Sequence, residues 1–305
     1  MFFLLLNILL IIFVPFLMLG LIKKTKAFWG GRKGISVFQP FYDFQRLICK
    51  KCVYSETTSF IFKLAPAILL ATVLFASIFV PMINGVSIYD IQFSFVIFAY
   101  ALGLGKFIFL LSALDTGSSF EGMGASREAC FSTIVEPAFF ILIASISVLS
   151  QNYSFHSLKY VLAQAGGYGI LVIILAVIVL LIMMLIESCR VPVDDPETHL
   201  ELTMIHEVMV LDNSGPDLAL INWASAIKMF LFSSLIANLV LPQNQNLWIN
   251  GILFLLILVL ISILIGTIES AMARFRMTHV FEFIFIMTIL SLLVLALVTY
   301  KLYGN

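Results

Sequence analysis

Charged residues are scarce in this sequence of 305 residues. Asp, Glu, Lys and Arg make up 11% of it, whereas hydrophobic residues make up 62% and the mean hydropathy is +1.11. Ordinary soluble domains are about 25% charged, and a soluble fold could not bury this much apolar surface. A soluble enzyme is therefore excluded. The net charge is zero, with 17 basic and 17 acidic side chains, so a basic nucleic-acid-binding surface is not expected either.

Cysteine is scarce as well, and cofactor motifs are missing. Four scattered cysteines (Cys49, Cys52, Cys130 and Cys189) are too few for a disulfide framework, and the CxxC pair formed by Cys49 and Cys52 has no second pair or nearby histidine. The sequence contains no P-loop, no glycine-rich dinucleotide fingerprint, no HExxH and no cysteine set for an iron–sulfur cluster. We expect no cofactor and no metal in this chain, and no catalysis by the chain alone.

Long apolar runs are abundant. A membrane-spanning helix needs about 20 mostly apolar residues, and eight runs meet this requirement: 2–22, 61–83, 91–114, 131–149, 168–187, 223–241, 248–268 and 279–300. The first run has no basic segment before it and no small-residue cleavage site after it, so we expect a retained span rather than a signal peptide. No linker or internal repeat divides the chain. The sequence predicts an all-α membrane protein that forms one polytopic domain over residues 1–305.

Lys and Arg between the spans are distributed unevenly. The first connection carries eight of them, and every second connection after it adds more: Lys23, Lys24, Lys26, Arg32, Lys33, Arg46, Lys50 and Lys51, then Arg127, then Arg190, then Arg274 and Arg276. The opposite side has only Lys159 and Lys301. The positive-inside rule therefore predicts a multi-pass protein of the cytoplasmic membrane with both termini outside. Loops 23–60 and 188–222 are then cytoplasmic.

The loop after the fifth run is rich in acids in apolar company. Pro192 and Pro196 end the preceding helix, and Asp195 is a suitable N-cap for a second helix from Pro196 to about Leu211. In that helix Glu197 and Glu201 share one face, where the two like charges repel each other. We expect this repulsion to raise the pKa of at least one of the two glutamates. The neighbours Met204, Ile205, Val208, Met209 and Val210 are apolar. This pattern indicates a helix folded back into the bundle, although a solvated surface helix is the simpler alternative.

Other ionisable residues fall within or beside the spans. Lys106 follows Gly103 and Gly105, which permit close helix approach, although snorkelling to the interface is the simpler interpretation. Four acids occupy the predicted inner ends of spans: Glu136, Glu187, Glu269 and Glu282. Ionisable groups in spans are functional candidates by default. Because the outer halves of the spans carry almost no charge, we expect a chamber that opens inward rather than a channel through the full membrane.

The sequence resembles a known family at several of these places. The run Glu187-x-x-Arg190-x-Pro192-x-Asp194-x-Pro196-Glu197-x-x-x-Glu201-Leu202 resembles the loop between helices five and six of subunit 1 of respiratory NADH:quinone oxidoreductase. Three further places are similar to the hydrogenase branch of that family, which includes formate hydrogenlyase subunit 4. They are the turn Leu114–Ser118 with Gly124–Ala129, the helix exit Glu269–Arg274, and the segment Gly30–Gly34 with Gln39, Pro40 and Asp43. The resemblance covers nearly the whole chain.

The resemblance implies a membrane anchor and ion-coupling subunit of a hydrogenase-type redox complex. Peripheral hydrogenase-like and iron–sulfur subunits, carrying iron–sulfur clusters and a nickel–iron centre, would dock on the cytoplasmic loops, and antiporter-like membrane subunits would flank the spans. Docking would involve Arg32, Lys33, Arg46 and Arg127. Ion coupling would involve Glu187, Arg190, Asp194, Asp195, Glu197, His199, Glu201, Glu207, Asp212, Glu136, Lys106 and Glu269.

Three alternatives remain at this point. Asp195 and His199 depart from the quinone-enzyme pattern, so a quinone-site subunit of an NADH dehydrogenase-like complex is a less favoured alternative. A stand-alone ion transporter is the second, and the lack of charge in the outer halves of the spans argues against it. The third is a passive anchor whose acids only dock partners.

Overall fold

The computed structural model describes residues 2–150, 154–155, 167–195, 204–241 and 246–303. Within these residues all regular structure is helical, and eight helices are long and apolar enough to cross a membrane. They are α1 (Phe2–Trp29), α3 (Phe60–Ser77), α4 (Ser94–Asp115), α5 (Ser119–Ser150), α7 (Gly167–Glu187), α9 (Pro216–Val240), α10 (Leu247–Ala271) and α11 (Met277–Tyr303). The prediction of an all-α membrane protein with eight spans is confirmed.

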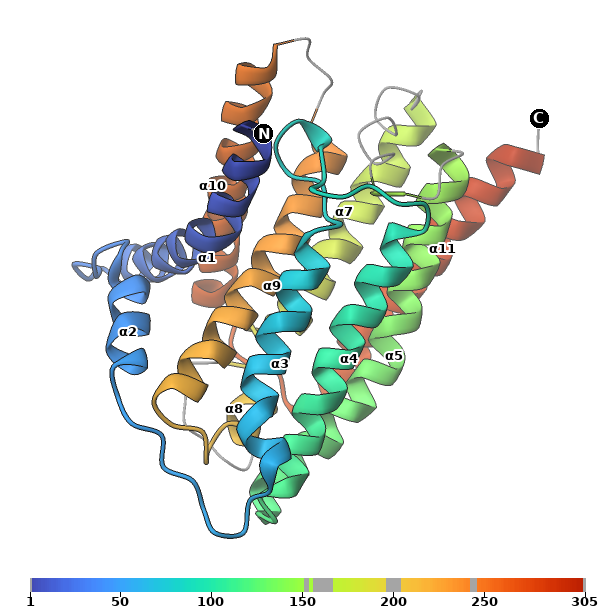
Figure 1. Cartoon of the computed structure of the whole chain (residues 1–305). Coiled ribbons are helices and arrows are strands. Elements are labelled where there is room, and N and C mark those ends of the chain that lie inside the picture. The colour runs from blue at the N-terminus through green and yellow to red at the C-terminus, as the bar shows by residue number, and fades with distance from the viewer. Residues whose placement is uncertain (1, 151–153, 156–166, 196–203, 242–245, 304–305) are drawn as a thin grey trace.

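Three shorter elements connect the spans. The helix α2 (Gln39–Ile48) lies beside α1 and α9, the 3-10 turn η1 (Ile83–Gly85) follows α3, and α8 (His206–Met209) packs against α5 (Figure 1). Phe41 and Phe44 of α2 contact Phe16 of α1 at ring-centroid distances of 5.6 and 5.2 Å. The helix α1 contains Pro15 and bends along its length (Figure 1), as expected where proline removes a backbone hydrogen bond.

The helix α9 lies at the centre of the bundle and packs against α1, α2, α3, α7 and α10 (Figure 1). Pro216 provides the first helical position, and Gly215, at φ +55°, supplies the turn before it. Two polar side chains of α9 are buried and bonded to one carbonyl: Asn238 Nδ2 donates to Pro81 O at 2.8 Å, and the Ser234 hydroxyl donates to the same oxygen at 2.6 Å. These bonds join α9 to the chain after α3.

The helices α3 and α4 pack closely at Gly105. A Cβ atom there would lie 2.2 Å from Thr72 Oγ1, whereas a Cβ at Gly103 would meet nothing within 4 Å. Of the two glycines expected to permit close approach, only Gly105 therefore requires it. At the inner end of this pair, the Ser59 backbone N–H donates to Asp115 Oδ2 at 2.7 Å. This bond fixes the start of α3 against the end of α4.

The helix α5 begins twelve residues before the predicted span 131–149. Its first turns are buried at Glu121, Gly124 and Ala125 against the segment that contains α8, and a Cβ at Gly124 would lie 2.9 Å from Ile205 O. Tertiary packing thus extends the helix through residues that were expected in a cytoplasmic turn. As a consequence, Glu136 lies in the middle of a helix and not at its inner end.

The predicted helix from Pro196 to about Leu211 is wrong in its described part. Residues 196–203 lie outside the described residues, and only His206–Met209 is helical in the remainder. Asp194 caps this short helix, because its Oδ2 accepts the backbone N–H groups of Ile205 at 3.2 Å and His206 at 2.8 Å. The apolar residues Met204, Ile205, Val208, Met209 and Val210 are all buried, so this segment does fold back into the bundle.

Candidate functional site: a buried chain of ion pairs between two cavities

The half of the bundle that contains α8 holds a buried ion pair between α4 and α7. Lys106 Nζ lies 2.6 Å from Glu187 Oε1, and each residue is only 7% exposed. Lys106 also lies 3.5 Å from Glu128 of α5, and Lys228 of α9 lies 3.9 Å from Glu187 Oε2. Lys106 is thus a buried cation and does not snorkel. Burying such charges is costly unless they are paired, and four helices supply the pairing.

A second buried cluster surrounds Glu269 at the C-terminal end of α10. Arg190 Nη1 lies 3.3 Å from Glu269 Oε1, and Lys26 Nζ of α1 lies 3.1 Å from Glu269 Oε2. Gly266 lies one turn earlier on α10, where a Cβ would lie 1.7 Å from Thr25 Oγ1. This close approach of α10 to α1 holds Lys26 beside Glu269.

Asp194 forms a third cluster, between α8 and the segment after α10. Its Oδ1 lies 3.2 Å from Arg274 Nη2 and accepts the Asp195 backbone N–H at 3.0 Å, while its Oδ2 caps α8. Burial raises the pKa of Asp194 above its ordinary value, whereas the His206 N–H and the Arg274 guanidinium act against that rise. Asp194 N–H donates to Arg190 O at 3.2 Å, so the second and third clusters share one backbone turn.

The segment around α8 is also fixed to α5. Arg127 Nη1 donates to Met204 O at 2.9 Å, and the Asp212 backbone N–H donates to Glu121 Oε1 at 3.1 Å. Glu121 is fully buried, whereas Asp212 is exposed. Arg127 and Asp212 were expected to dock a partner and to line the ion chamber, respectively. In the structure, both residues contribute bonds that hold the segment around α8 against α5.

Glu207 and His206 have strongly altered proton affinities. Burial, together with the charges of Asp194 and Asp195, raises the pKa of Glu207 to about 7. Burial, together with Lys228 and Lys106, lowers the pKa of His206 to about 3. The His206 ring lies 5.3 Å from the ring of Phe109 on α4. Near neutral pH the imidazole is therefore uncharged, whereas the neighbouring carboxyl group exchanges its proton.

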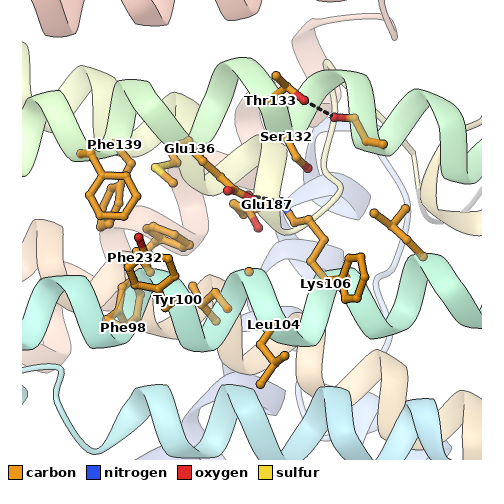
Figure 2. Close-up of a pocket in the computed structure, with 18 residues that line it drawn as sticks. Phe98, Tyr100, Leu104, Lys106, Ser132, Thr133, Glu136, Phe139, Glu187 and Phe232 are labelled. Atoms are coloured by element: carbon orange, nitrogen blue, oxygen red, sulfur yellow. Dashed lines mark hydrogen bonds and ion pairs between the residues drawn. The ribbon is translucent and has the colours of Figure 1, made fainter.

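Two cavities flank the C-terminal end of α7. The first, about 660 Å³, lies between α4 and α5, and Figure 2 shows Lys106, Glu136 and Glu187 pointing toward one another beside it. The second, about 320 Å³, lies between α1, α2 and α9 and is lined by polar residues that include Lys23, Asp43, Ser188, Cys189, Arg190, His206 and Glu207. Glu187 lines one cavity and the next three residues line the other. The end of α7 is thus a charged partition between them.

The other predicted residues are placed as follows. Arg32, Lys33 and Arg46 are exposed on the connection between α1 and α3, and α2 has no buried residue. Asp195 is half-buried beside Asp194. Glu197, His199 and Glu201 lie outside the described residues. Glu282 is exposed and lies 2.9 Å from His279, so it takes no part in the buried clusters.

Sequence reasoning missed several members of the buried clusters: Lys26, Glu121, Glu128, His206, Lys228 and Arg274. Lys228 carried a usable signal, because it is a charged residue within the run 223–241, just as Lys106 is within 91–114. Lys26 and Arg274 were interpreted only as topology signals. Their pairing with Glu269 and Asp194 depends on helices far apart in the sequence.

Comparison with solved structures identifies a similar fold. The chain superposes on a component of the membrane-bound sulfane sulfur reductase, an archaeal respiratory membrane complex, with a TM-score of 0.81. This match covers 97% of the chain and 98% of the solved one at 17% sequence identity. Identity at this level supports the fold alone.

Two Escherichia coli proteins are similar in sequence over most of their length. Hydrogenase-4 component C is 28% identical over 257 residues, which cover 84% of this chain and 80% of that protein. Formate hydrogenlyase subunit 4 is 24% identical over 276 residues, or 86% of each chain. An NADH-quinone oxidoreductase subunit from Methylococcus capsulatus is 28% identical over 143 residues, which cover 47% of this chain and 45% of that protein. The family model of NADH dehydrogenase matches residues 2–300, and the chain therefore belongs to the NADH dehydrogenase family.

Proposed function

We propose that this chain is the membrane anchor and ion-coupling subunit of a hydrogenase-type redox complex. The relatives named above support the class of complex, since two of them are a hydrogenase component and a formate hydrogenlyase subunit. The observation that carries the ion-coupling role is the set of three buried ion-pair clusters around the end of α7. Lys106 pairs with Glu187, Lys26 and Arg190 pair with Glu269, and Arg274 pairs with Asp194. A cavity lies on either side of the end of α7.

Coupling in this arrangement rests on electrostatics. Glu207 faces the cavity between α1, α2 and α9, and its pKa of about 7 lets it gain or lose a proton in the physiological range. A change of charge at this cavity alters the field at Arg190, which lines the same cavity and pairs with Glu269. Electron transfer in a docked arm would thus shift proton affinities along the buried pairs, and proton or sodium movement would follow. We propose that Glu197 and Glu201, which belong to the same loop, also contribute to ion coupling.

We propose that the exposed basic residues Arg32, Lys33 and Arg46 dock a peripheral arm that holds the iron–sulfur clusters and a nickel–iron centre. Charge reversal at these three positions should release the peripheral subunits from membranes while the chain itself stays inserted. The matched control is reversal of Lys301 at the far end of α11. If the arm stays bound at ordinary salt, the three residues serve only as topology signals.

The proposed orientation places these residues in the cytoplasm and both termini outside. Asp90 and Glu56 are exposed and lie at opposite ends of α3 and α4. A cysteine at Asp90 should therefore react with an impermeant reagent in intact cells, whereas a cysteine at Glu56 should react only after permeabilisation. The reverse pattern would invert the orientation.

The test of coupling is redox-driven proton or sodium uptake by membrane vesicles, measured against the amount of assembled complex. Glu207→Gln retains size and hydrogen-bonding capacity but cannot change charge, so uptake should fall sharply while assembly is unchanged. Asp212→Asn is the matched control, because the Asp212 side chain is exposed and only its backbone N–H bonds Glu121. Uptake at the wild-type level in the Glu207→Gln variant would leave a passive anchor as the better description.

A quinone site is the second candidate function. The cavity between α1, α2 and α9 has about 320 Å³, within the range of small-molecule sites, and Phe16, Phe44 and Trp223 line it together with Arg190 and His206. Aromatic walls with a few polar groups suit a quinone ring. Extraction of the purified complex and chromatography of the lipid fraction should then recover a quinone in stoichiometric amount. Its absence would support the hydrogenase-type assignment.

A further inference from the structure

Glu136 is exposed in the middle of the long span α5. It is 17 residues beyond Ser119, which at about 1.5 Å per residue places it about 25 Å along the helix. Its carboxylate borders the 660 Å³ cavity between α4 and α5, where Figure 2 shows it directed toward Glu187. Within the described part of the chain, no cation pairs with it at salt-bridge distance. An ionisable group so placed is costly against lipid.

The charge of this cavity is not balanced by the described residues around it. Glu128, Glu136 and Glu187 provide three carboxylates, whereas Lys106 and Lys228 provide two ammonium groups. Glu187 is more than nine-tenths buried, and its Oε2 has no hydrogen-bond donor within the described residues. The described residues around the cavity therefore provide one more carboxylate than ammonium groups, and the exposed carboxylate of Glu136 can receive one additional positive charge.

The exposed surface of α5 beside the cavity is made of small residues. Ala129, Cys130, Thr133 and Pro137 are all exposed and recur at helical spacing. Small residues let the backbones of two membrane helices approach closely. The exposed surface of α10 is different, since it consists of bulky aliphatic side chains: Ile252, Leu255, Leu256, Val259, Leu260, Ile263 and Leu264. The aliphatic surface suits lipid, whereas the α5 surface suits another helix.

We propose that the surface of α5 beside this cavity docks a transmembrane helix of another membrane subunit, and that this helix places a Lys or Arg side chain in the cavity against Glu136 and Glu187. This inference rests on the proposed function only in that it names a membrane partner of the same complex. A lipid acyl chain could fill the apolar volume, but it would leave the carboxylate of Glu136 unpaired. A basic residue satisfies both the volume and the charge.

The experiment uses the affinity-tagged full chain in its native membranes. A photo-reactive benzoylphenylalanine replaces Thr133 in one strain and Leu256 of α10 in a second, and irradiation is followed by tryptic mass spectrometry. At Thr133 the probe should attach to an integral membrane protein, within an apolar segment of at least about 18 residues that contains Lys or Arg. At Leu256 it should yield lipid adducts. Lipid adducts alone at Thr133, or a cross-linked segment without a basic residue, would overturn the proposal.

Two substitutions test the pairing itself. Glu136→Lys should reduce the amount of the cross-linked subunit that co-purifies with the chain by at least about tenfold, and Glu136→Gln should do so less severely. The amount of chain in the membrane distinguishes lost docking from lost folding. Retention of the subunit by Glu136→Lys would overturn the proposal. If the unsubstituted chain docks the subunit but the assembled complex shows no redox-driven ion uptake, only the proposed function is contradicted.

Discussion

The two cavities share one wall but differ in the groups that face them. The cavity between α4 and α5 has aromatic and aliphatic walls, and its charged groups Lys106 and Glu187 form a tight buried pair. The cavity between α1, α2 and α9 is more polar and contains Glu207 and His206, whose pKa values lie about 4 units apart. The pair of Lys106 and Glu187 thus provides fixed charges beside the first cavity, whereas the second cavity holds groups that titrate. Fixed pairs establish a field, and titrating groups respond to it.

The strongest test of this difference is to break the pair between Lys106 and Glu187. Removal of one partner leaves an uncompensated buried charge, so Lys106→Leu or Glu187→Leu should each destabilise the protein by about 3–5 kcal/mol. The double variant should recover most of this loss without recovering ion uptake. Chemical unfolding of the purified protein in detergent provides the measurement. Additive losses in the double variant would mean that the two charges are not coupled.

A smaller effect is expected at Asp194. Asp194→Asn removes the charge that faces Arg274 and leaves only one acceptor oxygen for the backbone N–H groups of Asp195, Ile205 and His206. The loss should be about 2–3 kcal/mol, with increased proteolysis near α8. Asp212→Asn is the control, because the Asp212 side chain is exposed and its backbone N–H donates to Glu121. An unchanged protease pattern in Asp194→Asn would show that the cap does not hold α8.

Glu207 should make stability fall as pH rises. Its pKa is raised to about 7 in the folded protein. Its contribution to the free energy of unfolding is therefore complete below about pH 4.5 and is lost as pH rises through 7. One pKa unit corresponds to about 1.4 kcal/mol, and after allowance for partial exposure the loss by pH 8 is about 2 kcal/mol. Glu207→Gln should lack this loss. Thermal unfolding from pH 5 to 8 should therefore show a difference between the variants that grows with pH.

His206 should have the opposite effect. Its pKa is lowered to about 3 in the folded protein. Its contribution to the free energy of unfolding is therefore complete above about pH 6.5 and is lost as pH falls toward 3. At pH 5 the loss should be about 2 kcal/mol. His206→Phe keeps an aromatic ring beside Phe109 and should remove this acid sensitivity. Unfolding between pH 7 and 5 measures it, and equal acid sensitivity in both proteins would assign the effect to another group.

The smallest effect is expected outside both cavities. His279 and Glu282 form an exposed pair at 2.9 Å near the start of α11. Exposed pairs contribute about 0.2–1 kcal/mol and are screened by salt. Glu282→Gln should therefore change the free energy of unfolding by less than about 0.5 kcal/mol and leave ion uptake unchanged. A larger change would mean that a partner subunit covers this end of α11 in the complex.

The sequence predicted much of the fold because the signal for a span is local. About 20 apolar residues in succession are sufficient to indicate each of the eight helices, and the family resemblance drew on short runs such as Glu187–Leu202. The helix boundaries were predicted less well where packing decides them. The first turns of α5 contain Glu121 and Arg127 and read as a polar turn, but the segment around α8 covers them.

The sequence by itself determined that the chain spans a membrane with eight helices, which family it resembles, and that acids gather near the inner ends of the helices. Only the tertiary structure decided how those acids are paired. Lys106 meets Glu187 across 81 residues, and Arg190 meets Glu269 across 79, so no local pattern indicates either contact. Apolar periodicity identifies a helix, but it does not specify how neighbouring helices are rotated. That rotation decides whether a buried charge faces a counter-charge, a cavity or lipid.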